Sequence, residues 1–364
     1  MTQLDKTIRC WRPDEWPAVD QTAWTRGCTA VGPYDDPYGA RRPGSTLRPD
    51  SLSKISKGYG RWFCFLDARG ELDPDQPPLA RVTRRRLRAY FHALRKAGNA
   101  DYTIIGRFDE LRKAMRILAP GVDVSWIDKP DGVSIYMLLP KIRRPMLVPD
   151  SGVLLAWAVD MMDQARAKTT APRRRLIDYR DGLLLAMLAS RGRRLRSMSV
   201  LRQGHEVLQR AEHYRVELTP DQVKTNKADH FGLPEELTPY IRHYLDAVRP
   251  ALLAGRTHDA FWISLDGTQM TAKAIQTQVF ARTGKAFERA FGPHRMRHAI
   301  ATTAALRASG HPGLGAGVLN ISGRTVEKSY NLAGQTAAAL TFAALIEARR
   351  RDSRGHHKPV RSGR

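Results

Sequence analysis

The sequence predicts a mainly α-helical protein with one small antiparallel β-sheet, organised in two domains. Apolar residues recur at helical spacing along most of the 364 residues. Only residues 205–234 alternate between apolar and polar positions and carry turn signals, a pattern typical of two or three short strands. A proline-rich stretch, residues 128–152, separates the two helical regions, and the chain is long enough for two cores of ordinary size.

The region before these prolines is expected to form a small helical bundle. Residues 1–48 are rich in Trp, Pro, Gly and Asp, which predicts an irregular N-terminal arm with one short helix. Residues 49–129 contain three amphipathic patterns that stop at Gly or Pro and have strongly basic outer faces. We therefore expect a helical domain over 49–129 and a linker over 130–150.

The second region, residues 151–348, is expected to be a mainly helical domain that contains the small sheet. Two long, mostly buried helices precede the strands, and further helices follow them. The expected helices cover residues 152–168, 176–192, 234–255, 271–292, 293–305 and 325–351. The end of the chain, residues 349–364, reads RRRDSRGHHKPVRSGR, which predicts a basic, disordered tail.

The charge balance narrows the class of partner. The chain has 60 lysines and arginines against 36 acidic residues, a formal net charge of +24. Such an excess favours an anionic polymer or surface, which means DNA, RNA or an anionic membrane. Hydrophobic residues make up 42%, so the chain is globular, and it has neither an apolar run of membrane-spanning length nor a signal-peptide core. Its 3 cysteines give no metal or disulfide pattern, so we expect a cytoplasmic protein.

The segment PHRMRHAIATTAA, residues 293–305, places several cationic side chains at the start of an apolar helix. His294 and Arg297 share a face of this helix, and His298 lies one turn after His294. A zinc site also uses histidines four residues apart, but Arg295 and Arg297 would repel the metal ion. A phosphate suits the segment better, because a guanidinium presents a planar fork of donors to phosphate oxygens. The alternative is a basic helix start that only meets solvent or a DNA backbone.

Two other segments carry candidate reactive groups. In SRGRRLRSMSVLRQG, residues 190–204, Arg194 shares a helical face with Met198 and Leu201. We expect Arg194 on the core side, where an arginine needs an anion, and a solvated arginine-rich turn is the alternative. In GRTVEKSYNLAG, residues 323–334, Tyr330 precedes an apolar helix, where a tyrosine is most often part of the core.

In their order and spacing, these segments resemble the tyrosine recombinase (phage integrase) family, of the integrase or transposase type found in mobile elements. The resemblance covers about residues 150–348, and it implies a tyrosine-recombinase-like catalytic domain preceded by a helical core-binding domain. It also assigns five catalytic roles. They belong to the first arginine Arg194, the hairpin lysine Lys224, the His-x-x-Arg pair His294 and Arg297, and the nucleophile Tyr330. Lys227 is the alternative lysine, because the register of the hairpin is open.

One position departs from the family pattern. The family usually has Leu-Gly-His about ten residues before the tyrosine, and the corresponding stretch here is VLNIS. This places Asn320 where a histidine, or sometimes a tryptophan, is expected. An asparagine donates a hydrogen bond but carries no proton charge, so slowed or specialised catalysis is one consequence of the substitution.

The resemblance implies site-specific cleavage and rejoining of DNA through a 3′-phosphotyrosine, in the integration, excision or transposition of a mobile element. The arginines would stabilise the charge on the phosphate, and Lys224 would protonate the leaving 5′ oxygen. This chemistry needs neither ATP nor a metal ion, so no cofactor is expected. The expected partners are double-stranded DNA, further copies of the chain in a tetramer, and sister recombinases or a directionality factor, but no membrane.

Additional DNA contacts are expected from basic side chains outside the catalytic set. They are Arg84, Arg85, Arg86 and Arg88 of the bundle, Lys227 and Arg324. For the arginine run, a solvated helix face is the alternative. Alternative functions are a dimer-resolving recombinase, a catalytically weakened DNA-binding accessory recombinase, a type IB topoisomerase and, more remotely, an RNA-binding protein.

Overall fold

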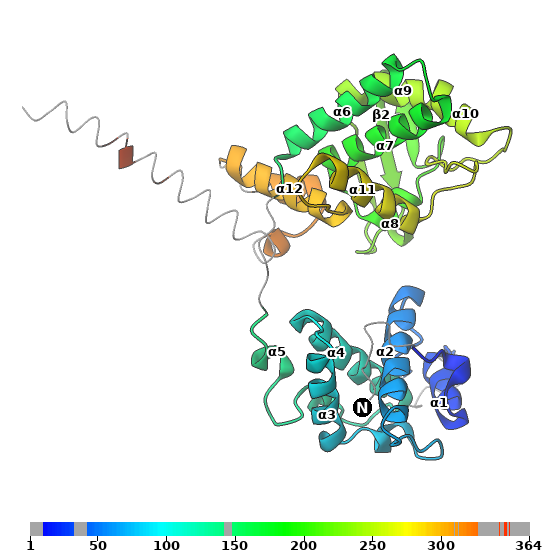
Figure 1. The fold of residues 1–364 in the computed structure, drawn as a ribbon, viewed down its shortest axis with the longest axis vertical. Helices are drawn as coiled ribbons and strands as arrows, with labels where there is room; N and C mark the ends of the chain where they lie inside the picture. Colours follow the sequence, from blue (N-terminus) through cyan, green and yellow to red (C-terminus); the bar gives the residue numbers. More distant parts are fainter. Residues whose placement is uncertain are drawn as a thin grey trace, which may run out of the picture. The chain divides into compact units, whose positions relative to one another are not determined.

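The computed structural model describes residues 10–32, 42–141, 148–308, 310–311 and 313–326, together with residues 342, 346, 347 and 349. The chain divides into two compact units, Met1–Pro145 and Met146–Arg364, and each has its own hydrophobic core (Figure 1). The predicted fold class is confirmed, because both units are mainly helical and the described strands form one three-stranded antiparallel sheet. No helix in the described ranges is both long and apolar enough to span a membrane.

The first unit is built around α2 (Pro49–Asp67) and α4 (Asp101–Leu118), which pack against each other. Their apolar faces bury large aromatic side chains, among them Trp62 and Phe63. α3 (Arg84–Lys96) begins after Thr83, whose hydroxyl caps the helix by accepting a hydrogen bond from the backbone of Arg86 at 3.2 Å. The shorter elements are α1 (Ala18–Cys28), α5 (Ile135–Leu138) and the 3-10 turns Pro13–Glu15, Pro78–Arg81 and Ser125–Asp128.

The described residues before α2 belong to this unit and do not form a separate N-terminal arm. Trp16 is buried among the core aromatics, and Asp20 of α1 is completely buried. The Asp20 carboxylate accepts hydrogen bonds from Tyr59 at 2.5 Å and from the equally buried Arg81 at 2.6 Å. The Pro- and Gly-rich composition predicted an irregular segment, but apolar burial and this ion pair attach it to the bundle.

The first unit also extends into the predicted linker. Ile135 and Leu139 lie within residues 130–150, yet both are buried in the core of the first unit. The division between the units falls at Pro145, and residues 142–147 lie outside the described part of the chain. Burial of these apolar residues attaches the stretch to the first unit, although its prolines predicted a linker.

The second unit packs α6 (Ser151–Ala167) along α7 (Pro172–Arg191). Every residue from Tyr179 to Ala189 is buried, which explains the apolar run of residues 183–189 in the second half of α7. The other helices are α8 (Leu195–Ser199), α9 (Thr238–His243), α10 (Arg249–Leu253), α11 (Ala272–Ala286), α12 (Pro293–Arg307) and α13 (Leu314–Leu319). A π turn (Tyr244–Val248) joins α9 to α10, so the helix expected over 234–255 is divided. The helix expected over 325–351 lies almost entirely outside the described residues.

The sheet has the strand order β1 (Val207–Arg210), β2 (His213–Leu218) and β3 (Asp229–Gly232). Its register places Val216 of β2 opposite both Val207 of β1 and Phe231 of β3. The turn between β2 and β3 carries the two candidate lysines. The sheet therefore brings this turn and the start of β3 into the same unit as α7 and α12.

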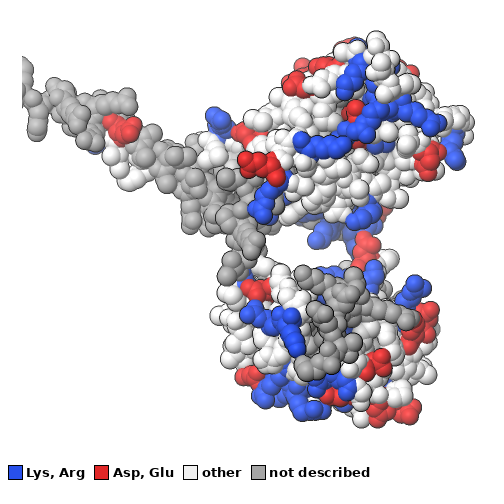
Figure 2. Space-filling model, in the orientation of Figure 1, with Lys and Arg blue, Asp and Glu red and all other residues white. Residues whose placement is uncertain are grey.

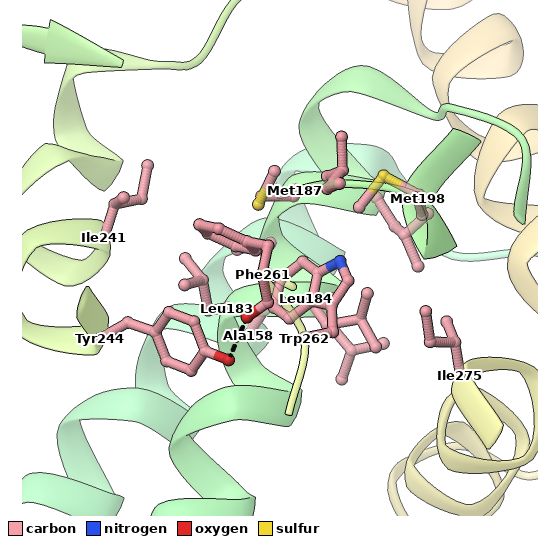
Figure 3. Packing of buried hydrophobic residues seen from close by; sticks show 14 of the residues in the cluster. Ala158, Leu183, Leu184, Met187, Met198, Ile241, Tyr244, Phe261, Trp262 and Ile275 are labelled. Carbon is pink, nitrogen blue, oxygen red and sulfur yellow. Dashed lines mark hydrogen bonds between the residues drawn. The ribbon is translucent and has the colours of Figure 1, made fainter. Parts of the chain in front are cut away.

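The core of the second unit gathers apolar side chains from helices that lie far apart in the sequence (Figure 3). The labelled residues include Leu183, Leu184 and Met187 of α7, Met198 of α8, Ile275 of α11, and the neighbours Phe261 and Trp262. The hydroxyl of Tyr244 donates a hydrogen bond to the carbonyl oxygen of Phe261 at 2.7 Å (Figure 3). This packing holds the end of α7 and the start of α8, where the first site residues lie.

Candidate active site

The candidate site begins at the glycine that ends α7. Gly192 has a φ of +50°, and a Cβ on it would come within 2.7 Å of the Ile300 side chain and 2.8 Å of the Leu319 side chain. Glycine suits this position for two reasons: it adopts the left-handed conformation without strain, and it has no Cβ to collide with these side chains. The turn at Gly192 therefore determines where the following two arginines leave the helix.

These two arginines have different environments. The fully buried one is Arg193, although the sequence pointed to Arg194. The Arg193 guanidinium pairs with Asp229 of β3 at 2.8 Å, and it lies over the Phe231 ring at 4.1 Å. Arg194 is half-buried at the N-cap of α8, and its guanidinium forms no ion pair or hydrogen bond with another described residue. Of the two, Arg194 is the arginine with donors left for an external anion.

Arg297 joins the His-x-x-Arg segment to the first arginine segment. It is buried in α12, and its guanidinium donates hydrogen bonds to the carbonyl oxygens of Gly192 and Leu319, the latter at 3.2 Å. Both carbonyls lie at the C-terminal ends of helices, α7 and α13, where a cation is favoured by the helix dipole. Residues 105 positions apart in the sequence are thus in direct contact, as the predicted site requires.

His294 lies among positive charges from three parts of the second unit. Partial burial lowers the pKa of its imidazole below the ordinary histidine value, and nearby cations lower it further. These cations are Arg297 and Arg295 of α12, Arg194 at the start of α8, and Lys224 of the β2–β3 turn. Lys224 and Lys227 are both exposed, but only Lys224 is among the charges that act most strongly on His294.

Asn320 has a structural role that the sequence did not reveal. It follows α13 with a φ of +47°, and the backbone N–H of Ile321 bonds to the carbonyl of Ala316 at 3.1 Å. The N–H of Asn320 itself bonds to Gly317 at 3.1 Å, which completes the Schellman ending of a helix, where the left-handed residue is usually glycine. The side chain lines a hollow of about 320 Å³ with Arg191, Arg193, Asp229 and Phe231, and none of the other predicted catalytic residues is in its described lining.

The arginine run of α3 is engaged within the first unit. Arg84 donates to the carbonyl of Pro130 at 3.0 Å, and Arg88 pairs with Asp131. Arg85 and Arg86 both pair with Glu71, at 3.3 and 2.9 Å. Since each member of the run already has an intramolecular partner, these contacts weaken the prediction that the run holds DNA.

A different face of the first unit gathers cations from two helices. Lys54, Lys57 and Arg61 of α2 and Arg107 of α4 line a surface hollow of about 430 Å³. The carboxylate at its base is Glu110, which is buried and pairs with Arg107 at 2.8 Å and, more loosely, with Lys54 and Arg61 at 3.8 and 3.9 Å. The sequence alone does not indicate these residues, because they are spread over two helices and form no run.

Three further predictions are not part of this geometry. Tyr330 lies outside the described residues, as does the basic tail apart from residue 349, and Arg324 is exposed. On the face drawn in Figure 2, basic side chains are spread over both units with acidic ones among them. In the part of the chain that the structure describes, no group of three His, Cys, Asp or Glu side chains is arranged to hold a metal ion.

Comparison with known proteins finds similar folds but no similar sequences. No family model matches the chain, and no curated protein does. The XerH site-specific recombinase, in a post-cleavage complex with its palindromic difH substrate, has a TM-score of 0.55 and 15% identity, over 82% of this chain and 80% of that one. The Tn1549 transposon integrase in complex with circular intermediate DNA has a TM-score of 0.52 and 13% identity, over 86% and 94%. The chain therefore has the fold of the tyrosine recombinases, as its motifs predicted.

Proposed function

We propose that this protein is a site-specific DNA recombinase that cleaves and rejoins DNA through a 3′-phosphotyrosine on Tyr330. It would serve the integration, excision or transposition of a mobile element and work as a tetramer on two DNA segments. The observation that carries the proposal is the convergence of Arg194, Lys224 and Arg297 around His294. Three separate segments thus supply a cluster of cations suited to a phosphodiester.

The chemistry follows from the charges. A tyrosine hydroxyl has an ordinary pKa near 10, so Tyr330 must lose its proton as it attacks the phosphorus. Negative charge then develops on the non-bridging oxygens, where Arg194 and Arg297 stabilise it. Lys224, on an exposed turn, donates the proton that the leaving 5′ oxygen requires. The covalent intermediate conserves the bond energy, so a 5′-hydroxyl reseals the strand by the reverse attack.

The first unit contributes non-specific affinity in this proposal. The hollow between α2 and α4 has four cations against Glu110 and Asp50 in its lining, so it retains a net positive charge. DNA phosphates would enter this hollow and release counterions. The run on α3, by contrast, would serve the stability of the unit more than DNA binding.

The experiment is covalent capture from a pool of nicked duplexes with a randomised central sequence. Duplexes that remain attached to the protein in denaturant are recovered, amplified and used again, and the attached residue is mapped by mass spectrometry. We expect enrichment of one sequence class and attachment at Tyr330, with no recovery for Tyr330→Phe. Capture that persists in Tyr330→Phe would contradict the proposed nucleophile.

The second candidate is a DNA-binding accessory recombinase with weakened catalysis. Because Asn320 has the left-handed conformation favoured for glycine, the family pattern Leu-Gly-His aligns with Leu319-Asn320-Ile321. An apolar Ile321, which packs against Ile300 and Leu319, then stands in the place of the histidine. Tight, salt-sensitive binding of the randomised duplexes without covalent capture would favour this candidate, and Ile321→His would be the variant expected to restore capture.

A further inference from the structure

Two histidines of α12 are in direct contact one helical turn apart. The Nε2 atoms of His294 and His298 lie 3.3 Å apart, and the two rings are nearly perpendicular, with centroids separated by 4.9 Å. Their i, i+4 spacing places both rings on the same face of the helix. His298 therefore contacts the candidate catalytic histidine itself, and no motif assigned it a role.

A hydrogen bond between two imidazole nitrogens constrains where protons can sit. One Nε2 must donate and the other must accept, so a single proton lies between the rings. Two imidazolium ions would point two N–H groups at each other and break the contact. While the contact holds, the pair therefore binds at most one proton beyond its neutral state.

The charges that act on His294 come from α12 itself and from two other elements. On α12 itself, Arg295 and Arg297 act on His294, and Arg194 and Lys224 reach it from α8 and the β2–β3 turn. Asp150, which precedes α6, is paired instead with Arg307 at the opposite end of α12, at 3.7 Å. α13 presents no ionisable side chain, and Arg193 at the end of α7 is neutralised by Asp229. A positive charge on His294 is thus opposed by cations from several elements.

We infer that His298 is the second member of a proton relay that begins at His294. In the proposed reaction, the proton that the nucleophile loses moves to Nδ1 of His294, and the proton on Nε2 of His294 moves to Nε2 of His298. The tyrosine oxygen gains the bond to phosphorus, His294 returns to a neutral ring with its tautomer exchanged, and His298 holds the positive charge. The contact between the two Nε2 atoms gives this proton a direct path away from His294, on which four cations act. The inference rests on the proposed function, since it assigns the proton that the nucleophile loses.

The first test uses the free, full-length protein and needs no DNA. With ¹⁵N-labelled histidine, the nitrogen chemical shifts of the two rings report tautomer and protonation across a pH titration. We expect the two rings to titrate together as a pair in the wild type, and His298→Gln to change the tautomer and the titration of His294. The matched control is His213→Ala, which removes an exposed histidine at the start of β2 and should leave His294 unchanged. Identical His294 titrations in wild type and His298→Gln would overturn the relay.

The second test measures single-turnover adduct formation as a function of pH, with the duplex selected by covalent capture. Glutamine keeps a hydrogen-bonding group at position 298 but cannot take up a proton, so we expect His298→Gln to lower the plateau rate by about 10²-fold, the low end of the range for acid–base groups. We also expect its acidic limb to move to lower pH, because a single ring among cations binds a proton less tightly than the pair.

The outcomes separate the two proposals. If the plateau rate of His298→Gln equals that of the wild type, or is lower while the acidic limb of the pH profile stays in place, His298 has only a structural role. Either result would overturn the relay but not the proposed function. A wild type that forms no Tyr330-dependent adduct would overturn the proposed function and the relay with it, even if the two rings are coupled in the free protein.

Discussion

The arginines of α3 and the cations around His294 differ in what surrounds them. Arg85 and Arg86 share Glu71, and Arg88 pairs with Asp131, so these three guanidiniums of α3 have acidic partners within the first unit. Arg194 of the second unit has no ion pair in the described part of the chain. The densest basic run in the sequence is therefore a poorer candidate for an anion-binding site than a single arginine beside a glycine turn.

The contrast between Arg193 and Arg194 makes the same point over one residue. A buried guanidinium needs acceptors for its donors, and for Arg193 the carboxylate of Asp229 supplies both acceptors and a compensating charge. A half-buried guanidinium without an acid has its donors available for a ligand. The position of intramolecular carboxylates, which is a property of the fold, thus separates structural arginines from candidate ligand-binding ones.

The largest expected effect comes from removing such a carboxylate. Asp229→Ala leaves Arg193 buried without its partner, and we expect a loss of about 3–5 kcal/mol in the free energy of unfolding. Urea unfolding of the full chain, followed by circular dichroism, measures this loss. The double variant Asp229→Leu with Arg193→Leu should recover most of it, and a loss equally large in the double variant would mean that the ion pair is not the cause.

A smaller effect separates the two basic faces of the first unit. For a cation that contacts a DNA phosphate, substitution reduces the slope of log affinity against log salt by about one. We expect this reduction for Lys57→Ala in the α2–α4 hollow and no reduction for Arg85→Ala on α3, in anisotropy titrations of a fluorescent duplex at several salt concentrations. A reduced slope for Arg85→Ala with an unchanged slope for Lys57→Ala would indicate that DNA binds to the arginines of α3 instead.

The cations around His294 also predict the direction of a pH effect. Because the folded-state pKa of His294 lies below the unfolded value, the unfolded chain binds more protons, and stability falls as pH falls through about 6.5. Histidines titrate between about pH 7.5 and about pH 5.5. Over this range, the free energy of unfolding should fall less steeply in His294→Gln than in the wild type. The pKa of His243 is also lowered by burial, so part of the slope should persist in the variant, and an unchanged slope would contradict the charged surroundings of His294.

The smallest expected effect concerns Asn320. Glycine adopts the left-handed conformation without strain, so Asn320→Gly should leave stability unchanged or raise it by up to about 1 kcal/mol. Asn320→Ala should be less stable than Asn320→Gly, because alanine pays the steric penalty without the local hydrogen bonding of asparagine. Thermal unfolding of both variants tests this order. Loss of DNA cleavage in a stable Asn320→Gly protein would instead support a catalytic amide.

Much of the fold was predictable from the sequence, because helical periodicity and helix-stop residues are local signals. The start of α12 at Pro293 and the presence of short strands within residues 205–234 followed from such signals. The attachment of α1 to the first unit was not predictable, since it depends on the buried contact between Asp20 and Arg81, 61 residues apart. The division of the helix after residue 234 by a π turn likewise has no clear local signal.

The candidate site was predictable as a set of segments but not in its details. The motifs selected Arg194, His294 and Arg297, and the structure brings these segments together in the second unit. Spacing alone suggested that Asn320 takes the place of a histidine, whereas its positive φ suggests a shift of one residue. The contact between His294 and His298 also required coordinates, because i, i+4 spacing allows two rings to meet but does not orient them.

The most direct test of the contrast between neutralised and available arginines is the rate of covalent adduct formation in two single variants. Arg194→Ala and Arg85→Ala remove the same group, and neither should change stability by more than about 0.5 kcal/mol. The substrate is the duplex selected by covalent capture. For Arg194→Ala we predict a rate of adduct formation lower by about 10²–10³-fold, which is the usual effect of removing one donor to a developing oxyanion. For Arg85→Ala we predict a rate close to that of the wild type. Equal rates in the two variants, with both proteins folded, would contradict the assignment of Arg194 to the reacting phosphate.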